Sequence, residues 1–421
     1  MSLPVSPTTA RPAADAVTYP ARAVVDLSAI RHNLGVLAAA APGAQVMAVV
    51  KADAYGHGLL PVARAALAGG ATWLGAAQLA EALELRAGLD AAGAGVGHGT
   101  GSETGAAAGS RTAGVRPRIL TWLFAPGAPL GRALEADLDL SASAPWAVEE
   151  IAAAARATGR TARVHLKVDT GMGRGGARPE AFGDLLDAAS RARAEGAVEI
   201  VGIWSHLACA DEAGSPVTAQ QTAVFALALA QAERAGVRPE VRHLAASSGT
   251  LFHPATHFDL VRPGIAVYGL TPAPGIAGSA QLGLRPAMRL EARLTVVKPA
   301  PAGTPLSYGH TARTSTDTYI AVVPLGYGDG VPRAASDRGP VTVGGRRLHV
   351  AGRVCMDQVV VDLGPQGAGV REGDLAVLFG DGAAEPSADD WAEVCGTINY
   401  EIVTRLGARV PRVHVDPEAR P

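Results

Sequence analysis

Eight short apolar runs separated by alanine-rich stretches constrain this chain more than any other feature. The intervening stretches are amphipathic and of helical length, as in Leu59–Ala68, Trp146–Ala157 and Thr218–Ala235. Alternation of strands and helices predicts parallel strand pairing. The runs are Gln45–Val50, Trp73–Ala76, Arg118–Leu123, Leu138–Ala142, Arg163–Val168, Ile200–Trp204, Val241–Ala245 and Asp259–Val261. The count favours an α/β fold with a closed (β/α)8 TIM-type barrel, although a doubly wound open sheet also fits the alternation.

The pattern changes near Thr271, and a length of 421 residues suits two domains. Short β-type runs separated by Gly and Pro turns predict a mainly β C-terminal domain over residues 271–421. Its runs are Met288–Val297, Tyr319–Pro324, Pro340–Val343, His349–Leu363 and Leu375–Phe379. The barrel domain is expected over residues 19–270, although the strand-like segment Arg22–Asp26 can pair with the β-domain instead.

Two segments carry no strand or helix pattern. Residues 1–18 are rich in Pro, Ala, Ser and Thr and are interpreted as a disordered leader; they have no basic segment followed by an apolar stretch, so they do not form a secretory signal. Residues 92–114 consist mostly of Gly, Ala, Ser and Thr, a composition that predicts a flexible surface insertion.

Composition excludes several classes of function. Hydrophobic residues make up 48% of the chain and the net charge is −2, so neither nucleic acid nor a membrane surface is an expected partner. No apolar run reaches the ~18 residues of a membrane span. The three cysteines lack metal-ligand spacing, which argues against a metal site and favours a reducing, cytoplasmic location.

Basic and hydroxyl side chains follow several of the predicted strands, at the ends where barrels hold their active sites. Lys51 ends the first strand, Lys167–Arg174 follows the fifth, and His206 ends the sixth. Ser247 ends the seventh strand and Arg262–Ile265 follows the eighth; the loops after these two strands are the usual phosphate site of such barrels. A phosphate site together with a lone lysine is what a Schiff-base cofactor requires.

The segment Val49–Gly58, VVKADAYGHG, resembles the pyridoxal-lysine signature of the alanine racemase family. The resemblance covers about residues 19–411, and the short motifs are specific in this order and spacing. The other matches are Lys167–Arg174, Ser205–Ala208, Val261–Ile265, Ser307–Gly309, Gly326–Gly330, Cys355–Gln358 and Thr397–Glu401. The resemblance implies pyridoxal 5'-phosphate as cofactor and a homodimer with shared active sites. It also implies interconversion of L- and D-alanine, which supplies D-alanine for peptidoglycan.

The resemblance implies two opposed bases, Lys51 and Tyr308 of the partner subunit. Lys51 would hold the cofactor and, once substrate forms the external aldimine, move a proton on one face. Racemisation needs a second base on the other face, and Tyr308 matches it. Because an unperturbed tyrosine has a pKa near ~10, we expect a cationic neighbour beside Tyr308.

Further roles are implied by the same resemblance. Arg262 would face the ring nitrogen and, as a donor only, keep that nitrogen unprotonated, which discourages transamination and decarboxylation. His206 would support Arg262. Arg174 would bind the ring hydroxyl and the substrate carboxylate, and Met356 would bind that carboxylate through its backbone N–H from the other subunit.

The remaining matches concern the phosphate, the entrance and a modified lysine. The additional cofactor-binding residues are Tyr55, Ser247, Gly264, Ile265 and Tyr400. Tyr327 would line the entrance. Lys167 matches a lysine that is carbamylated in several members, and the alternative is an ion pair with Asp169.

Two residues depart from the family pattern, and three other functions compete with alanine racemisation. Ala246 stands where a polar residue commonly precedes the serine, and Gly175 where a branched apolar residue is frequent.

A broader amino-acid racemase would use the same machinery. A non-catalytic carrier of pyridoxal phosphate would lack the β-domain, and a related decarboxylase would place an acid, not Arg262, against the ring nitrogen.

Overall fold

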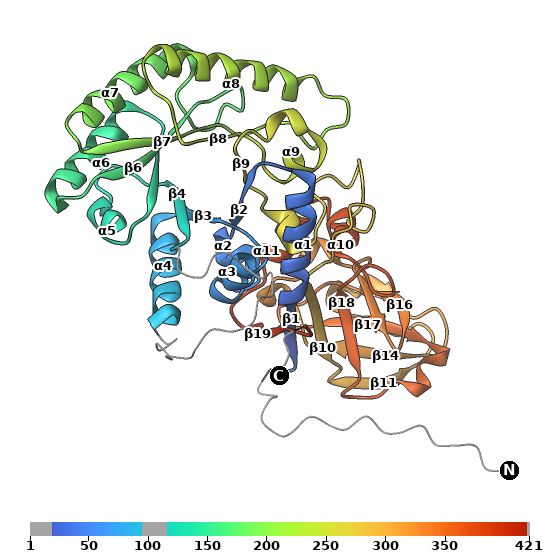
Figure 1. The fold of residues 1–421 in the computed structure, drawn as a ribbon. Coiled ribbons are helices and arrows are strands. Elements are labelled where there is room, and N and C mark those ends of the chain that lie inside the picture. Colours follow the sequence, from blue (N-terminus) through green and yellow to red (C-terminus); the bar gives the residue numbers. More distant parts are fainter. Residues whose placement is uncertain (1–18, 95–115, 419–421) are drawn as a thin grey trace, which may run out of the picture.

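The computed structural model describes residues 19–94 and 116–418, in which eight parallel strands form a nearly closed barrel. The strand order is β8-β7-β6-β5-β4-β3-β2-β9, so the predicted barrel is confirmed and the open sheet is not formed (Figure 1). The strands are β2 (Gln45–Val49), β3 (Trp73–Gln78), β4 (Arg118–Leu123), β5 (Asp139–Ala142), β6 (Ala162–Lys167), β7 (Val198–Trp204), β8 (Val241–His243) and β9 (Leu260–Val261).

The barrel closes between its shortest strands, β8 and β9. The backbone N–H of Asp259 donates to the carbonyl of Arg242 over 3.0 Å, and that of Arg262 donates to Ala245 over 2.9 Å. These bonds bring the segments that follow β8 and β9 side by side. Because all strands are parallel, their carboxyl ends meet at one end of the barrel.

Alanine-rich helices follow most of the barrel strands and lie outside the sheet (Figure 1). In α6 (Pro145–Thr158), Pro145 occupies the first turn and Gly159 ends the helix in the left-handed region. Its buried residues, Ala147, Val148, Ile151, Ala152 and Ala155, recur at helical spacing and form the face that packs on the barrel. Other helices in this part of the chain include α1 (Leu27–Ala40), α3 (Leu59–Ala68), α4 (Leu79–Ala94), α5 (Leu130–Glu135), α7 (Phe182–Ala194), α8 (Val217–Arg234) and α9 (Ser247–Phe252).

The C-terminal part of the chain is mainly β, as predicted. A six-stranded sheet has the order β16-β15-β18-β10-β1-β19, and a three-stranded sheet has the order β11-β14-β17. Strand β1 (Ala21–Asp26) lies among these late strands, antiparallel to β10 (Met288–Arg293) and parallel to β19 (Arg412–Val415) (Figure 1). The other strands are β11 (Val296–Ala300), β12 (Pro305–Leu306), β13 (Ala312–Arg313), β14 (Thr318–Val323), β15 (Pro340–Val343), β16 (Arg346–His349), β17 (Val359–Gly364) and β18 (Leu375–Phe379).

Two of the predicted β runs are not single strands. The run 288–297 divides into β10 and β11, which belong to different sheets. The run 349–363 divides into β16 and β17, and the intervening loop includes Gly352 with a φ of +82°. The expectation was wrong because apolar residues of this loop, such as Val354, are buried by packing without joining a strand.

The predicted leader, residues 1–18, lies outside the described residues, as does the predicted insertion from residue 95 onward. Helix α4 continues to Ala94, past the residue at which the insertion was expected to begin. Within the described ranges, no helix combines the length and the apolar composition needed to cross a membrane.

Candidate functional site

A cavity of about 280 Å³ opens among the segments that follow the barrel strands. Five basic side chains predicted for the site line it: Lys51, Lys167, Arg174, His206 and Arg262. The other predicted residues on its wall are Tyr55, Ser247, Gly264, Ile265 and, from α11 (Asn399–Thr404), Tyr400. The structure therefore brings together in one cavity ten of the predicted residues, drawn from six separate segments of the sequence.

Lys51 is presented by a left-handed turn that directly follows β2. The φ angles of Ala52, Asp53, Ala54 and Tyr55 lie between 52° and 55°, and none of these residues is glycine. Left-handed backbone costs about 1–2 kcal/mol per residue, so surrounding contacts must hold it. The turn buries Tyr55 to 6% exposure and leaves the Lys51 Nζ 5.9 Å from the centre of the Tyr55 ring.

Burial and neighbouring positive charges lower the pKa values of both lysines in the cavity. Burial lowers the pKa of Lys51, and Arg174 lowers it further. Burial, together with Arg262 and Arg174, lowers the pKa of Lys167 to about 8. Burial and Arg262 also hold the pKa of His206 well below its usual value. The cavity thus holds two amines that lose their protons more readily than ordinary lysines, beside arginines that stay charged, an arrangement that favours anionic ligands.

Hydroxyl groups cluster around Gly264 at another wall of the cavity. The Ser247 Oγ accepts the backbone N–H of Gly264 over 2.9 Å and that of Ala266 over 3.3 Å. A Cβ on residue 264 would lie 2.2 Å from the Tyr55 Oη, so only glycine leaves room for that hydroxyl. The Tyr55 and Tyr400 rings lie 6.2 Å apart. Tyrosine and serine hydroxyls that still have hydrogens to donate suit a phosphate group.

Arg262 is 4% exposed and is held by several acceptors. Its Nη2 donates to the carbonyls of Ser205 and Leu244 over 2.8 and 3.1 Å. The expected partner His206 lies 3.4 Å from Nη2 through its Nδ1, and His243 lies closer, 3.2 Å from Nη1. Burial lowers the pKa of Arg262 to about 9, which leaves the guanidinium protonated at neutral pH.

Comparison with known proteins identifies the family to which the chain belongs. Residues 25–272 match the family model described as alanine racemase, N-terminal domain, and residues 287–414 match the one described as alanine racemase, C-terminal domain. The chain belongs to the alanine racemase family. The predicted resemblance and the enzyme class, an isomerase, are thereby confirmed.

Individual relatives agree with the family models over nearly the whole chain. An alanine racemase of Beutenbergia cavernae is 61% identical over 400 residues, which cover 95% of this chain and 99% of that protein. One of Streptomyces coelicolor is 53% identical over 414 residues, covering 98% of this chain and 100% of that protein. The crystal structure of alanine racemase from Streptomyces lavendulae superposes with a TM-score of 0.87 at 51% identity and covers 95% and 98% of the two chains.

Three residues matched to the alanine racemase site do not line the cavity. Tyr308, Met356 and Tyr327 are 70%, 54% and 43% exposed, respectively. Two of their loops are tied together, because Gly328 donates its N–H to the carbonyl of Met356 over 2.8 Å. A single chain of this alanine racemase family member therefore presents Tyr308 to the outside and not to Lys51.

The surroundings of Lys167 bear on its two predicted states. Its Nζ lies 4.3 Å from the centre of the Trp204 ring. The Oδ1 of Asp169, the alternative partner, instead accepts the backbone N–H groups of residues 171–173 at 2.9 to 3.1 Å. At the departure from the alanine racemase pattern, a Cβ on Gly175 would lie 3.6 Å from the Lys167 Nζ, an ordinary contact.

Some residues of the site were not predicted from the sequence. Trp122 and Trp204 stand near the carboxyl ends of β4 and β7, so asking which residues end every strand would have found them. Met172 lies within the Lys167–Arg174 match but was assigned no role, and Asp211 lies in the loop after β7, where no sequence pattern marks its contact with the cavity. His243 is an isolated histidine in an apolar strand, which by itself indicates only a core residue.

Proposed function

We propose that this protein is an alanine racemase that interconverts L- and D-alanine with pyridoxal 5'-phosphate as its cofactor. The observation that carries the proposal is the half-buried Lys51, which shares one cavity with cationic groups and with the hydroxyls around Gly264. The residues suit the cofactor. Lys51 would bind its aldehyde carbon, while Tyr55, Ser247 and Tyr400 would hold its phosphate.

When bound, the cofactor withdraws electrons from the amino acid and makes the α-hydrogen acidic. The lowered pKa of Lys51 favours a neutral amine that can accept this proton. Arg262, which only donates, would hold the ring nitrogen unprotonated. Arg174 would bind the substrate carboxylate as an ion pair.

The second base of the proposal is Tyr308, contributed by a second copy of the chain. The position of Tyr308 in the single chain supports this role. Tyr308 and Met356 are both exposed on the β-domain, away from the cavity of their own chain. A homodimer would let these residues complete the partner's cavity, with Tyr308 delivering or removing a proton on the face opposite Lys51. Met356 would contribute a backbone N–H to the carboxylate, and Tyr327 would lie at the entrance.

A carbamylated Lys167 is part of this proposal. Its pKa, lowered to about 8, gives Lys167 a larger fraction of neutral amine than an ordinary lysine has. That amine would attack carbon dioxide and release a proton to solvent, and the resulting carbamate anion would lie near Arg262 and Arg174. Protein prepared in ¹³C-bicarbonate should show a carbamate carbon signal in the NMR spectrum that Lys167→Arg removes. Equal signals in both proteins would refute the modification.

The test of the proposed function is incubation of purified protein with L-alanine and chiral analysis of the product. We expect D-alanine to reach equality with L-alanine when pyridoxal phosphate is present, and Lys51→Ala to abolish the reaction. A parallel series with serine and larger amino acids separates an alanine racemase from a broader racemase. Binding of the cofactor without racemisation of any amino acid would indicate a carrier.

The biological setting completes the proposal. D-Alanine produced in the cytoplasm would supply peptidoglycan synthesis. The three free cysteines, Cys209, Cys355 and Cys395, support a reducing compartment.

A further inference from the structure

A chain of buried polar side chains crosses the interior of the barrel. It begins at Asp139, the first residue of β5, continues through His165 in β6 and His243 in β8, and ends at Arg262. The Oδ2 of Asp139 lies 3.1 Å from the Nε2 of His165. The His165 Nδ1 lies 2.9 Å from the His243 Nε2, and the His243 Nδ1 lies 3.2 Å from the Arg262 Nη1. This polar chain connects the amino end of the barrel to the cavity at the other end.

The two end groups determine the direction of every hydrogen bond in the polar chain. A carboxylate only accepts and a guanidinium only donates. His165 must therefore donate from Nε2 to Asp139 and accept at Nδ1, and His243 must do the same one step further on. Both imidazoles are neutral in this arrangement. Burial, followed by the charge of Arg262, holds the pKa of His243 well below its usual value, which agrees with a neutral ring.

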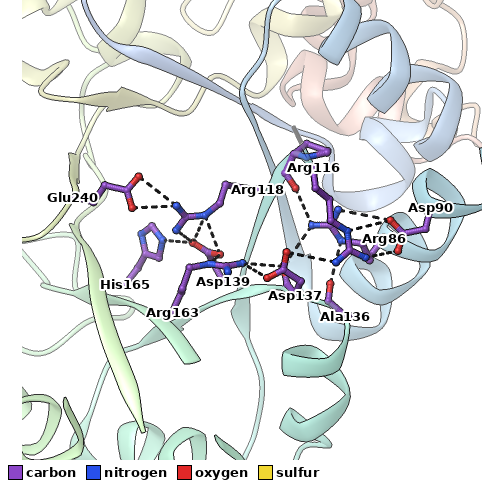
Figure 2. Close-up of polar contacts among 11 residues, drawn as sticks. Arg86, Asp90, Arg116, Arg118, Ala136, Asp137, Asp139, Arg163, His165 and Glu240 are labelled. Carbon is purple, nitrogen blue, oxygen red and sulfur yellow. Dashed lines mark hydrogen bonds and ion pairs between the residues drawn. The ribbon is translucent and has the colours of Figure 1, made fainter. Parts of the chain in front are cut away.

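Two arginines fix the acceptor end of the polar chain. Figure 2 shows Arg118 and Arg163 directed at the Asp139 carboxylate, with His165 also bound to it. Arg118 in turn pairs with Glu240, which is 52% exposed, over 3.1 Å. Although burial raises the pKa of Asp139, the hydrogen bonds from His165 and Arg118 lower it to about 2. Asp139 is therefore a permanent anion at neutral pH.

The barrel is built to leave room for these rings. A Cβ on Gly202 in β7 would lie 2.0 Å from the His165 Nδ1, so any side chain there would displace the histidine. The Trp204 ring stacks on His243, with centroids 5.5 Å apart and planes at 5°. Barrel interiors are usually filled by branched apolar side chains, and buried polar groups are costly unless they are paired. Packing alone does not require this arrangement.

We propose that Asp139 and His165 are positioning residues that act through His243 to hold Arg262 in the orientation that donates into the cavity. This inference rests on the proposed function, in which Arg262 donates to the ring nitrogen of pyridoxal phosphate. Because Nη1 is bound by His243 and Nη2 by backbone carbonyls, the guanidinium cannot turn without breaking these bonds. The charge of Asp139 polarises both imidazoles and strengthens the acceptor that faces Arg262.

The direct test is ¹⁵N NMR of the purified full-length protein, with and without added pyridoxal phosphate, labelled in its histidine rings. His165 and His243 should both be neutral at pH 7 and carry hydrogen on Nε2, with His165→Leu and His243→Leu assigning the two signals. A protonated ring, or hydrogen on Nδ1, at either position would overturn the proposal. These nitrogens are read without activity, so a protein that binds no cofactor or racemises no alanine would refute the proposed function and leave this measurement valid.

Variants at position 165 test the order of donors and acceptors. His165→Gln offers a donor to Asp139 and an acceptor to His243, whereas His165→Leu offers neither. With cofactor labelled by ¹⁵N in its ring, His165→Leu should shift the ring-nitrogen signal. It should also lower kcat about tenfold, the equivalent of one hydrogen bond to a charged group, with little change in the KM for alanine. His165→Gln should recover most of both.

Met47→Leu is the matched control, because Met47 is fully buried in the barrel interior with Trp73 and Leu120 but belongs to no polar chain. This variant should change neither the ring-nitrogen signal nor kcat. An unchanged ring-nitrogen signal in His165→Leu, or equal losses in the Gln and Leu variants, would overturn the proposal.

Discussion

The carboxylate of Glu81 accepts the backbone N–H of Asp53 over 2.9 Å and so holds the turn that presents Lys51. Glu81 belongs to α4, which follows the next strand of the barrel, so the support comes from outside the turn. The Oδ1 of Asp53 accepts the N–H of Leu59 over 2.7 Å and fixes the other end of the turn. The position of Lys51 thus depends on a carboxylate that no sequence motif includes.

Removing that acceptor should loosen the binding of the cofactor. We expect Glu81→Ala to weaken binding of pyridoxal phosphate about tenfold, because the backbone N–H of Asp53 loses a charged acceptor. Titration followed by visible absorption measures the affinity. Glu84→Gln, an exposed carboxylate one turn further along α4, is the control and should bind as wild type does. Equal affinity in Glu81→Ala and wild type would contradict the role of Glu81.

Because the turn after β2 is left-handed, a substitution by glycine within it should stabilise the fold. Ala52 is exposed and has a φ of 55°, so Ala52→Gly should raise the free energy of unfolding by up to ~1 kcal/mol. Ala153, which is exposed in the right-handed helix α6, is the matched control. Ala153→Gly should lower the free energy of unfolding by ~1 kcal/mol. Denaturant titration of both variants gives the sign of each change in the free energy of unfolding. A destabilised Ala52→Gly variant would contradict the left-handed conformation of this turn.

The lysines offer a covalent test of the cofactor site. The sequence contains only three, Lys51, Lys167 and Lys298. Borohydride reduction in the presence of pyridoxal phosphate should label Lys51, as peptide mapping can verify. Because the pKa of Lys51 lies below its ordinary 10.5, its labelling should reach the maximum at a lower pH than that of an ordinary exposed lysine. Lys298→Arg should label as wild type does, whereas a label confined to Lys167 would refute the assignment.

The depressed pKa of Asp139 predicts a loss of stability in acid. Its value of about 2 in the folded protein lies below the ordinary 3.8, so this carboxylate stabilises the fold above about pH 4. That contribution, roughly 2 kcal/mol, should disappear as the pH falls from about 4 to 2. Melting temperatures across this range should show a smaller slope in Asp139→Asn than in wild type. Glu240→Gln is the control, and an unchanged slope in Asp139→Asn would contradict the depressed pKa.

Mixed dimers test the shared active site. Lys51→Ala and Tyr308→Phe should each be nearly inactive as homodimers, since every site lacks one base. Random mixing makes half of the dimers mixed, each with one intact site of two, so about a quarter of wild-type activity should return. Chiral assay after subunit exchange measures the recovery. If exchange is verified and activity stays absent, the two residues do not act across subunits.

The barrel was predictable because strands buried on both faces read as continuous apolar runs, and all eight lie close to their expected bounds. The turn at Lys51 was not predictable, since residues 52–55 contain no glycine to indicate a positive φ. The pairing of His165 with His243 was not predictable either, because it spans β6 and β8 across β7, where Gly202 leaves room for the rings, and no single strand pattern reveals this. The role proposed for Tyr308 depends on a second copy of the chain, because its own chain leaves that residue exposed.

The position of β1 has a consequence for biosynthesis. Ala21–Asp26 leaves the ribosome early, whereas its neighbours β10 and β19 begin at Met288 and Arg412. Until those segments are translated, the nascent strand has no edge to join and must be kept from pairing with other chains. A gene fragment ending after the barrel would leave β1 permanently without its neighbours. We therefore expect the barrel to need the rest of the polypeptide in the same molecule to accumulate in soluble form.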